Sequence, residues 1–120
     1  MIDPFNPETS PPVIAGLKSF ALGVHLTAVE KGWWEEGRRA SFGEFIALSH
    51  SELSEALEAS RDGDPPDEKL PAFRNLEVEL ADCILRILDY AQASDLRVIE
   101  AMVAKAAFNK TRPYRHGKKF

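Results

Sequence analysis

Two pairs of carboxylates, each with a three-residue step, most strongly constrain how this 120-residue chain can fold. Glu52 and Glu55 form the first pair, and Glu79 and Asp82 form the second. Both pairs lie in segments whose apolar residues recur at helical spacing, and on an α-helix a three-residue step places two side chains side by side. Two such helices can therefore face each other and surround a hard cation with carboxylate oxygens, the ligands that Mg²⁺ and Mn²⁺ prefer.

Apolar residues recur with helical periodicity in four segments, and no segment shows persuasive strand alternation. Ser41 and Glu44 form a capping box that starts the second helix, and Pro113 ends the fourth. The expected helices run from about Pro11 to Lys31, from Ser41 to the polar loop at 61–69, from near Pro71 to about Ala91, and from Ser94 or Asp95 to near Arg112. These elements predict one all-α domain over 1–120, an antiparallel four-helix bundle-like unit with an N-terminal extension at 1–10 and a basic C-terminal tail at 113–120.

The charges of the chain are unevenly distributed, although the net charge is only −4. Six of the 15 basic residues and none of the 19 acidic residues lie in 101–120. Lys105, Asn109 and Arg112 follow an i, i+4, i+7 spacing on the fourth helix, and these residue types bind phosphate oxygens. The basic segment either meets an anion near the acidic region or is simply solvated, and charge alone leaves both interpretations open.

The composition, with 44% apolar and 28% charged residues, is typical of a soluble globular protein. The sequence has no unbroken apolar run of 18 residues and no basic region followed by an apolar core near Met1. We therefore expect a cytoplasmic protein with no membrane partner, and the acidic body argues against nucleic acid as a partner. The single cysteine, Cys83, excludes an internal disulfide and is expected to be a small buried hydrophobic residue.

Each candidate residue also has a plain structural interpretation. The glutamates could form a solvated helix face, and Asp82 could make a local i,i+4 ion pair with Arg86. Trp33 and Trp34 could each fill the core at the end of the bundle or stack on a planar ligand such as a nucleobase. His25 is expected to be a structural histidine with a satisfied hydrogen bond, because no second His or Cys lies at ligand spacing.

A carboxylate-bound metal beside a group of Lys, Arg and Asn side chains suits the cleavage of phosphoanhydride bonds. Other chemistries fit the sequence less well. It contains no GxxxxGK[ST] phosphate loop, no CxxC zinc pattern and no GxSxG nucleophile elbow. The Glu-x-x-His pairs of carboxylate-bridged di-iron bundles are also missing.

Taken in order, these motifs resemble the MazG-like all-α nucleoside triphosphate pyrophosphohydrolases. The resemblance covers about 13–120, and its motifs are Glu52-x-x-Glu55, Glu79-Leu80-Ala81-Asp82, and the run from Lys105 and Asn109 through Arg112-Pro113-Tyr114 to His116-Gly117-Lys118-Lys119. It implies hydrolysis of a (deoxy)nucleoside triphosphate to the monophosphate and pyrophosphate, with Mg²⁺ as cofactor and Mn²⁺ as a substitute. It also implies a homodimer or homotetramer assembled through a helical interface.

The resemblance also implies roles for individual residues. Glu52, Glu55, Glu79 and Asp82 would be the metal ligands, with Glu52 and Glu55 as catalytic residues. The residues that would bind phosphate are Lys105, Asn109, Lys110, Arg112, Tyr114, His116 and Lys118. Trp33 and Trp34 are candidates for base contact on physical grounds only, and Ser51 stands where the family motif often has a further glutamate. The alternative function is a non-catalytic helical module that senses a nucleotide or binds another protein.

Overall fold

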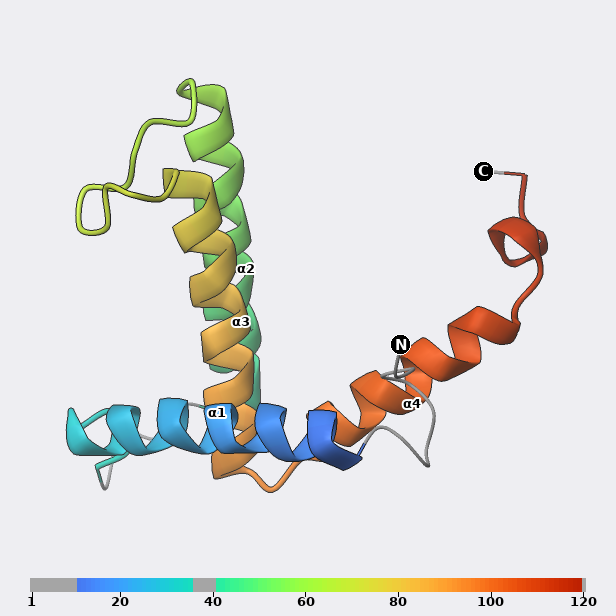
Figure 1. Ribbon diagram of the computed structural model, residues 1–120. Coiled ribbons are helices and arrows are strands. Elements are labelled where there is room, and N and C mark those ends of the chain that lie inside the picture. The colour runs from blue at the N-terminus through green and yellow to red at the C-terminus, as the bar shows by residue number, and fades with distance from the viewer. Residues whose placement is uncertain (1–10, 36–40, 120) are drawn as a thin grey trace.

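The structure is a computed structural model that describes residues 11–35 and 41–119. Four α-helices and one short 3₁₀ helix follow in order (Figure 1): α1 (Pro11–Glu30), α2 (Phe42–Arg61), α3 (Asn75–Ala93), α4 (Val98–Thr111) and η1 (Tyr114–Gly117). The described residues form no strand, and their only β-type pairing is an isolated bridge between Pro66 and Arg74. The all-α class is therefore confirmed for this part of the chain, while the expected extension at 1–10 lies outside it.

The helix ends show which local signals in the sequence decide the structure. The Glu44 backbone N–H donates to the Ser41 hydroxyl at 3.1 Å, as the capping box predicts. α3 begins later than expected because the preceding residues form a turn, in which the Asp67 N–H donates to the Phe73 carbonyl at 2.8 Å. α4 also begins later than expected, after Asp95, whose φ of 54° lies in the left-handed region and does not continue a right-handed helix.

The packing of the helices gives an L-shaped core with a projecting arm (Figure 1). α2 and α3 lie side by side as an antiparallel pair, α1 crosses the C-terminal part of α3, and α4 packs on α1. Ala21, Leu88 and Ile99 form a buried cluster where α1, α3 and α4 meet. Beyond that junction α4 and η1 extend away from the α2–α3 pair, so the pair and the arm are separate parts of one chain.

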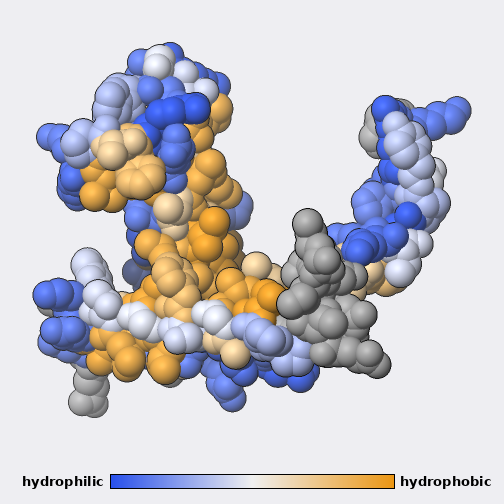
Figure 2. All heavy atoms as spheres, in the orientation of Figure 1, coloured by the Kyte–Doolittle hydropathy of each residue, from blue (hydrophilic) through white to orange (hydrophobic). Residues whose placement is uncertain are grey.

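This arrangement leaves much apolar surface exposed (Figure 2). The radius of gyration is 17.0 Å, whereas a compact domain of this length is expected to have roughly 14 Å. Exposed apolar side chains follow the sides of α2 and α3, and they include Ile46, Leu53, Leu57, Leu80 and Ile84. A single chain therefore leaves an apolar side of the α2–α3 pair uncovered.

α1 has the length and composition of a membrane-spanning helix, with a mean hydropathy of 1.4. The sequence nevertheless has no unbroken apolar run of that length, because Lys18 and His25 interrupt it. One side of α1 contacts α3 and α4, whereas Phe20 and Leu26 on this helix are exposed. α1 is thus a packed helix with a second, uncovered apolar side.

Candidate functional site

Three of the four carboxylates expected to bind metal come together between α2 and α3. One carboxylate oxygen from each of Glu52, Glu55 and Glu79 lies within 4.8 Å of the others. Glu52 is buried, with 8% of its surface exposed, while Glu79 is half-buried and Glu55 is exposed. The three-residue step on α2 and the antiparallel packing of α3 therefore build an acidic cluster with one buried and one open side.

Burial and neighbouring carboxylates both disfavour the charged forms of Glu79 and Asp82. Burial raises the pKa of the Glu79 carboxyl from 4.5 to about 7, and hydrogen bonding and charge repulsion from Glu55 and Glu52 add to the effect. Burial and the charge of Glu52 likewise raise the pKa of Asp82, an effect that the nearby Arg86 guanidinium partly offsets. A divalent cation would relieve this repulsion, and an all-carboxylate donor set suits Mg²⁺ or Mn²⁺. The residues present therefore fit such an ion.

The raised pKa of Glu79 predicts an unusual pH dependence of stability. In metal-free protein between pH 4.5 and about 7, the folded chain holds a proton on Glu79 that the unfolded chain has released. The contribution of Glu79 to stability is therefore fully present below pH 4.5 and is lost as the pH rises through about 7. Glu79→Gln keeps the side chain neutral throughout and should flatten this dependence. Melting temperatures measured in EDTA from about pH 5 to about pH 8 should fall more steeply for the native chain than for the variant. Parallel curves would contradict the charge crowding.

Asp82 and Arg86 lie differently from what their spacing suggests. Asp82 is exposed and is not part of the three-carboxylate group. Arg86 forms its ion pair with Glu52 across the helix pair, with Nη2 donating to Oε1 at 2.7 Å, rather than with Asp82 on its own helix. Arg86 was not among the candidate site residues predicted from the sequence, whereas the structure places it beside Glu52 and in the cavity lining. The available signal was its position seven residues after Glu79, which places both side chains on nearly the same side of α3.

A cavity of about 860 Å³ adjoins the carboxylates between α1, α2 and α3. Its aromatic walls are Trp33, Trp34, Phe45 and Tyr90, and its charged lining includes Lys31, Glu44, Glu52, Asp82, Arg86 and Asp89. This volume is within the range of small-molecule sites. The cavity therefore offers aromatic faces at one end and shares Glu52 with the acidic cluster.

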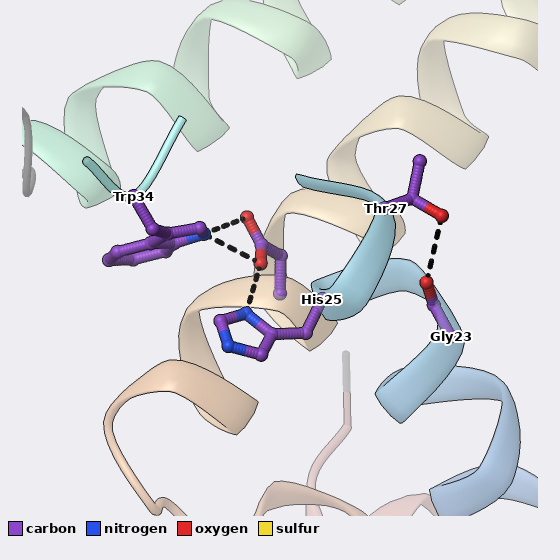
Figure 3. Close-up of polar contacts among 5 residues, drawn as sticks. Gly23, His25, Thr27 and Trp34 are labelled. Carbon is purple, nitrogen blue, oxygen red and sulfur yellow. Dashed lines mark hydrogen bonds and ion pairs between the residues drawn. The ribbon is translucent and has the colours of Figure 1, made fainter. Parts of the chain in front are cut away.

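Asp89 holds Trp34, one aromatic wall of the cavity, in place, and Figure 3 shows the contacts of Trp34 and His25. The Trp34 indole N–H donates to both Asp89 oxygens, at 2.9 and 3.1 Å, and His25 Nδ1 lies 2.8 Å from Oδ1 of the same carboxylate. The His25 and Trp34 rings meet edge to face with centroids 5.8 Å apart. His25 is thus hydrogen-bonded as a structural histidine. Trp34 is a fixed wall, whereas Trp33 is 68% exposed beside the same cavity.

The expected phosphate-binding residues lie on the projecting arm, away from the carboxylates. Lys105, Asn109 and Lys110 are on α4, Arg112 caps its end, and Tyr114, His116 and Lys118 belong to η1 and the residue that follows it. None of these residues lines the 860 Å³ cavity, whose described walls come from α1, α2, α3 and the segment after α1. Lys105 and Arg112 instead lie over the Phe108 ring, at 5.0 and 5.7 Å from its centroid. One chain therefore does not join the two halves of the expected site.

In comparisons with family models, with curated proteins and with solved structures, nothing matches this chain. The candidate site thus consists of the carboxylate cluster, the ion pair beside it and the adjoining cavity.

Proposed function

We propose that this protein is a Mg²⁺-dependent nucleoside triphosphate pyrophosphohydrolase that releases a nucleoside monophosphate and pyrophosphate. The observation that carries the proposal is the cluster of Glu52, Glu55 and Glu79, whose carboxylate oxygens lie within 4.8 Å of one another. The cluster borders a cavity of the size that a small organic ligand needs. The order of the sequence motifs, which resembles that of the MazG-like enzymes, supports the same conclusion.

The carboxylates supply the binding and positioning in this proposal. Glu52, Glu55 and Glu79 would hold Mg²⁺, with Asp82 at the cavity side of the cluster. Bound Mg²⁺ would neutralise charge on phosphate oxygens and lower the pKa of coordinated water. The exposed side of the cluster is formed by Glu55, and its carboxylate can accept a hydrogen bond from the attacking water.

The aromatic end of the cavity suits the base of the nucleotide. Trp34 is fixed by Asp89, and Trp33 is exposed beside it. Flat aromatic faces stack on any nucleobase, and stacking is tolerant of the base's identity. The nucleotide would therefore lie with its base toward Trp33 and Trp34 and its phosphates toward Glu52.

A second copy of the chain would bring the basic residues of α4 to the carboxylates, which lie apart in one copy. Exposed apolar residues on α2 and α3, including Leu53 and Ile84, would pair with the same residues of a partner and close a four-helix bundle. The projecting α4 would then bring the partner's Lys105 and Asn109 toward the carboxylates. We therefore propose a homodimer, or a tetramer made of two such dimers, as the active species.

Product analysis with a panel of nucleoside and deoxynucleoside triphosphates tests the proposal. We expect equal amounts of monophosphate and pyrophosphate, produced with Mg²⁺ or Mn²⁺ and abolished by EDTA. Ion-exchange chromatography separates the two products and identifies the preferred base. Release of orthophosphate instead would assign a different bond specificity, and no turnover by protein whose helicity is verified by circular dichroism would overturn the proposal.

The alternative is a helical module that binds a nucleotide or a protein without catalysis. The observation in its favour is the basic arm that projects from the core, with Tyr114 85% exposed at its end. In that case nucleotides would bind unchanged, or not at all. Product analysis together with equilibrium dialysis of the same nucleotides separates these outcomes.

A further inference from the structure

Arg86 connects the carboxylate cluster to the cavity. Its Nη2 donates to Glu52 Oε1 at 2.7 Å, and the side chains of Arg86 and Glu52 are 37% and 11% exposed. A guanidinium carries five N–H donors, and this contact uses one of them. Its Nε is buried and has no hydrogen-bond partner among the described residues. Most of the donor capacity of Arg86 is therefore unused.

Glu52 lies where it could bind either of two cations. It pairs with the Arg86 guanidinium, and it is also one of the three carboxylates whose oxygens gather within 4.8 Å. A divalent ion on this cluster and a guanidinium on the same carboxylate would repel each other at short range. Arg86 therefore opposes metal binding for as long as it stays paired with Glu52.

The cavity provides Arg86 with a different partner. Arg86 lines it together with Lys31 and Asp82, next to the part of Glu52 that borders the same space. The planar fork of a guanidinium matches phosphate oxygens and can bind them through two parallel hydrogen bonds. An anionic ligand in the cavity would thus use the donors that Glu52 leaves unused.

We propose that Arg86 is a ligand-binding residue that exchanges its partner: it is the counter-ion of Glu52 in the free protein and binds a phosphate oxygen of the metal-bound ligand. This inference rests on the proposed function, because it assumes a divalent ion at the carboxylates and a phosphoanhydride in the cavity. It adds a phosphate contact from the same chain, independent of the residues on the arm. Metal binding to Glu52 would release Arg86 for the phosphate, and phosphate binding to Arg86 would release Glu52 for the metal. Each binding event would therefore favour the other.

Two affinities measured separately test the exchange. Mn²⁺ binding is followed by electron paramagnetic resonance, first with the ion alone and then with imidodiphosphate, a non-hydrolysable pyrophosphate analogue. Arg86→Met should bind Mn²⁺ alone about three- to tenfold more tightly, since a competing cation is gone. The same variant should bind imidodiphosphate with Mn²⁺ at least about tenfold more weakly, since a charged hydrogen bond is lost. Arg86→Lys should leave Mn²⁺ affinity near the native value and weaken imidodiphosphate binding by less.

Arg61→Met serves as the matched control, because Arg61 is an exposed arginine at the end of α2 and does not line the cavity. It should change neither affinity. A fall in both affinities in Arg86→Met and Arg86→Lys, with helicity retained, would show a purely structural ion pair and overturn the inference. Absence of Mn²⁺ binding in every protein would overturn both the inference and the proposed metal site. Opposite shifts without turnover of any nucleotide would uphold the exchange and reject the proposed catalysis.

Discussion

Glu55→Gln is expected to lower nucleotide turnover by about 100-fold or more while leaving the fold intact. Glu55 is exposed, so the substitution removes no core contact, and glutamine keeps the shape of the side chain. It removes the negative charge of one of three carboxylates that lie within 4.8 Å of one another. Loss of a group that only supports a metal ligand typically costs 10–100-fold in affinity or activity, so loss of a ligand itself should cost at least as much.

Glu58→Gln is the matched control for this variant. Glu58 lies one turn further along α2, is also exposed, and is not part of the carboxylate cluster. Pyrophosphate release by the two variants should therefore differ by about the full 100-fold, at equal helicity and with Mg²⁺ in excess. Equal rates for Glu55→Gln and Glu58→Gln would show that the cluster is a solvated polar surface, which is the plain interpretation of the sequence.

Ile84→Glu is expected to dissociate the proposed dimer into monomers and to lower turnover strongly. Ile84 is 58% exposed in the single chain, so a glutamate there is compatible with the helix pair itself. In a symmetric dimer each substitution occurs twice in one interface, and burial of unpaired charge at an apolar contact costs several kcal/mol. The dimer dissociation constant should rise at least about 100-fold. Turnover should fall with it, because in the proposed dimer the phosphate-binding side chains come from the partner's α4.

Leu70→Glu provides the comparison, since Leu70 is 53% exposed but lies in the loop between α2 and α3. Sedimentation velocity over a range of protein concentrations should show a dimer for the native chain and Leu70→Glu, and a monomer for Ile84→Glu. Two results would contradict this interface: a native chain that sediments as a monomer, and an Ile84→Glu protein that stays dimeric. Either would show that the apolar side of α2 and α3 does not mediate self-association. In the second case the exposed side of α1 would be the next surface to substitute.

The features that the sequence predicts well are the local ones. The capping interaction of Ser41 and Glu44 depends on residues three apart, and it forms as expected. The placing of Glu52 and Glu55 on one side of α2 is local in the same way, whereas the approach of Glu79 from α3 depends on how the two helices pack. The start of α3 was less predictable, because it depends on a turn closed between Asp67 and Phe73 rather than on helix propensity.

The features that the sequence could not supply depend on register and on distant packing. Whether Arg86 pairs with Asp82 or with Glu52 is decided by how α2 and α3 are aligned, which local spacing does not determine. The direction of α4 is decided by its packing on α1, so the spacing of Lys105 and Asn109 says which side of the helix they share but not what that side faces. Both cases concern contacts between residues far apart in the chain.

The shared carboxylate of Asp89 has a mechanical consequence. It accepts from an indole that follows α1 and lies 2.8 Å from an imidazole within α1, while it is itself anchored on α3. Any sliding or rotation of α1 against α3 must therefore strain both contacts at the same time, and it must carry the Trp34 ring with it. The position of α1 is therefore coupled to the width of the cavity. A contact on the outer side of α1 that shifted this helix would also shift the Trp34 ring that lines the cavity.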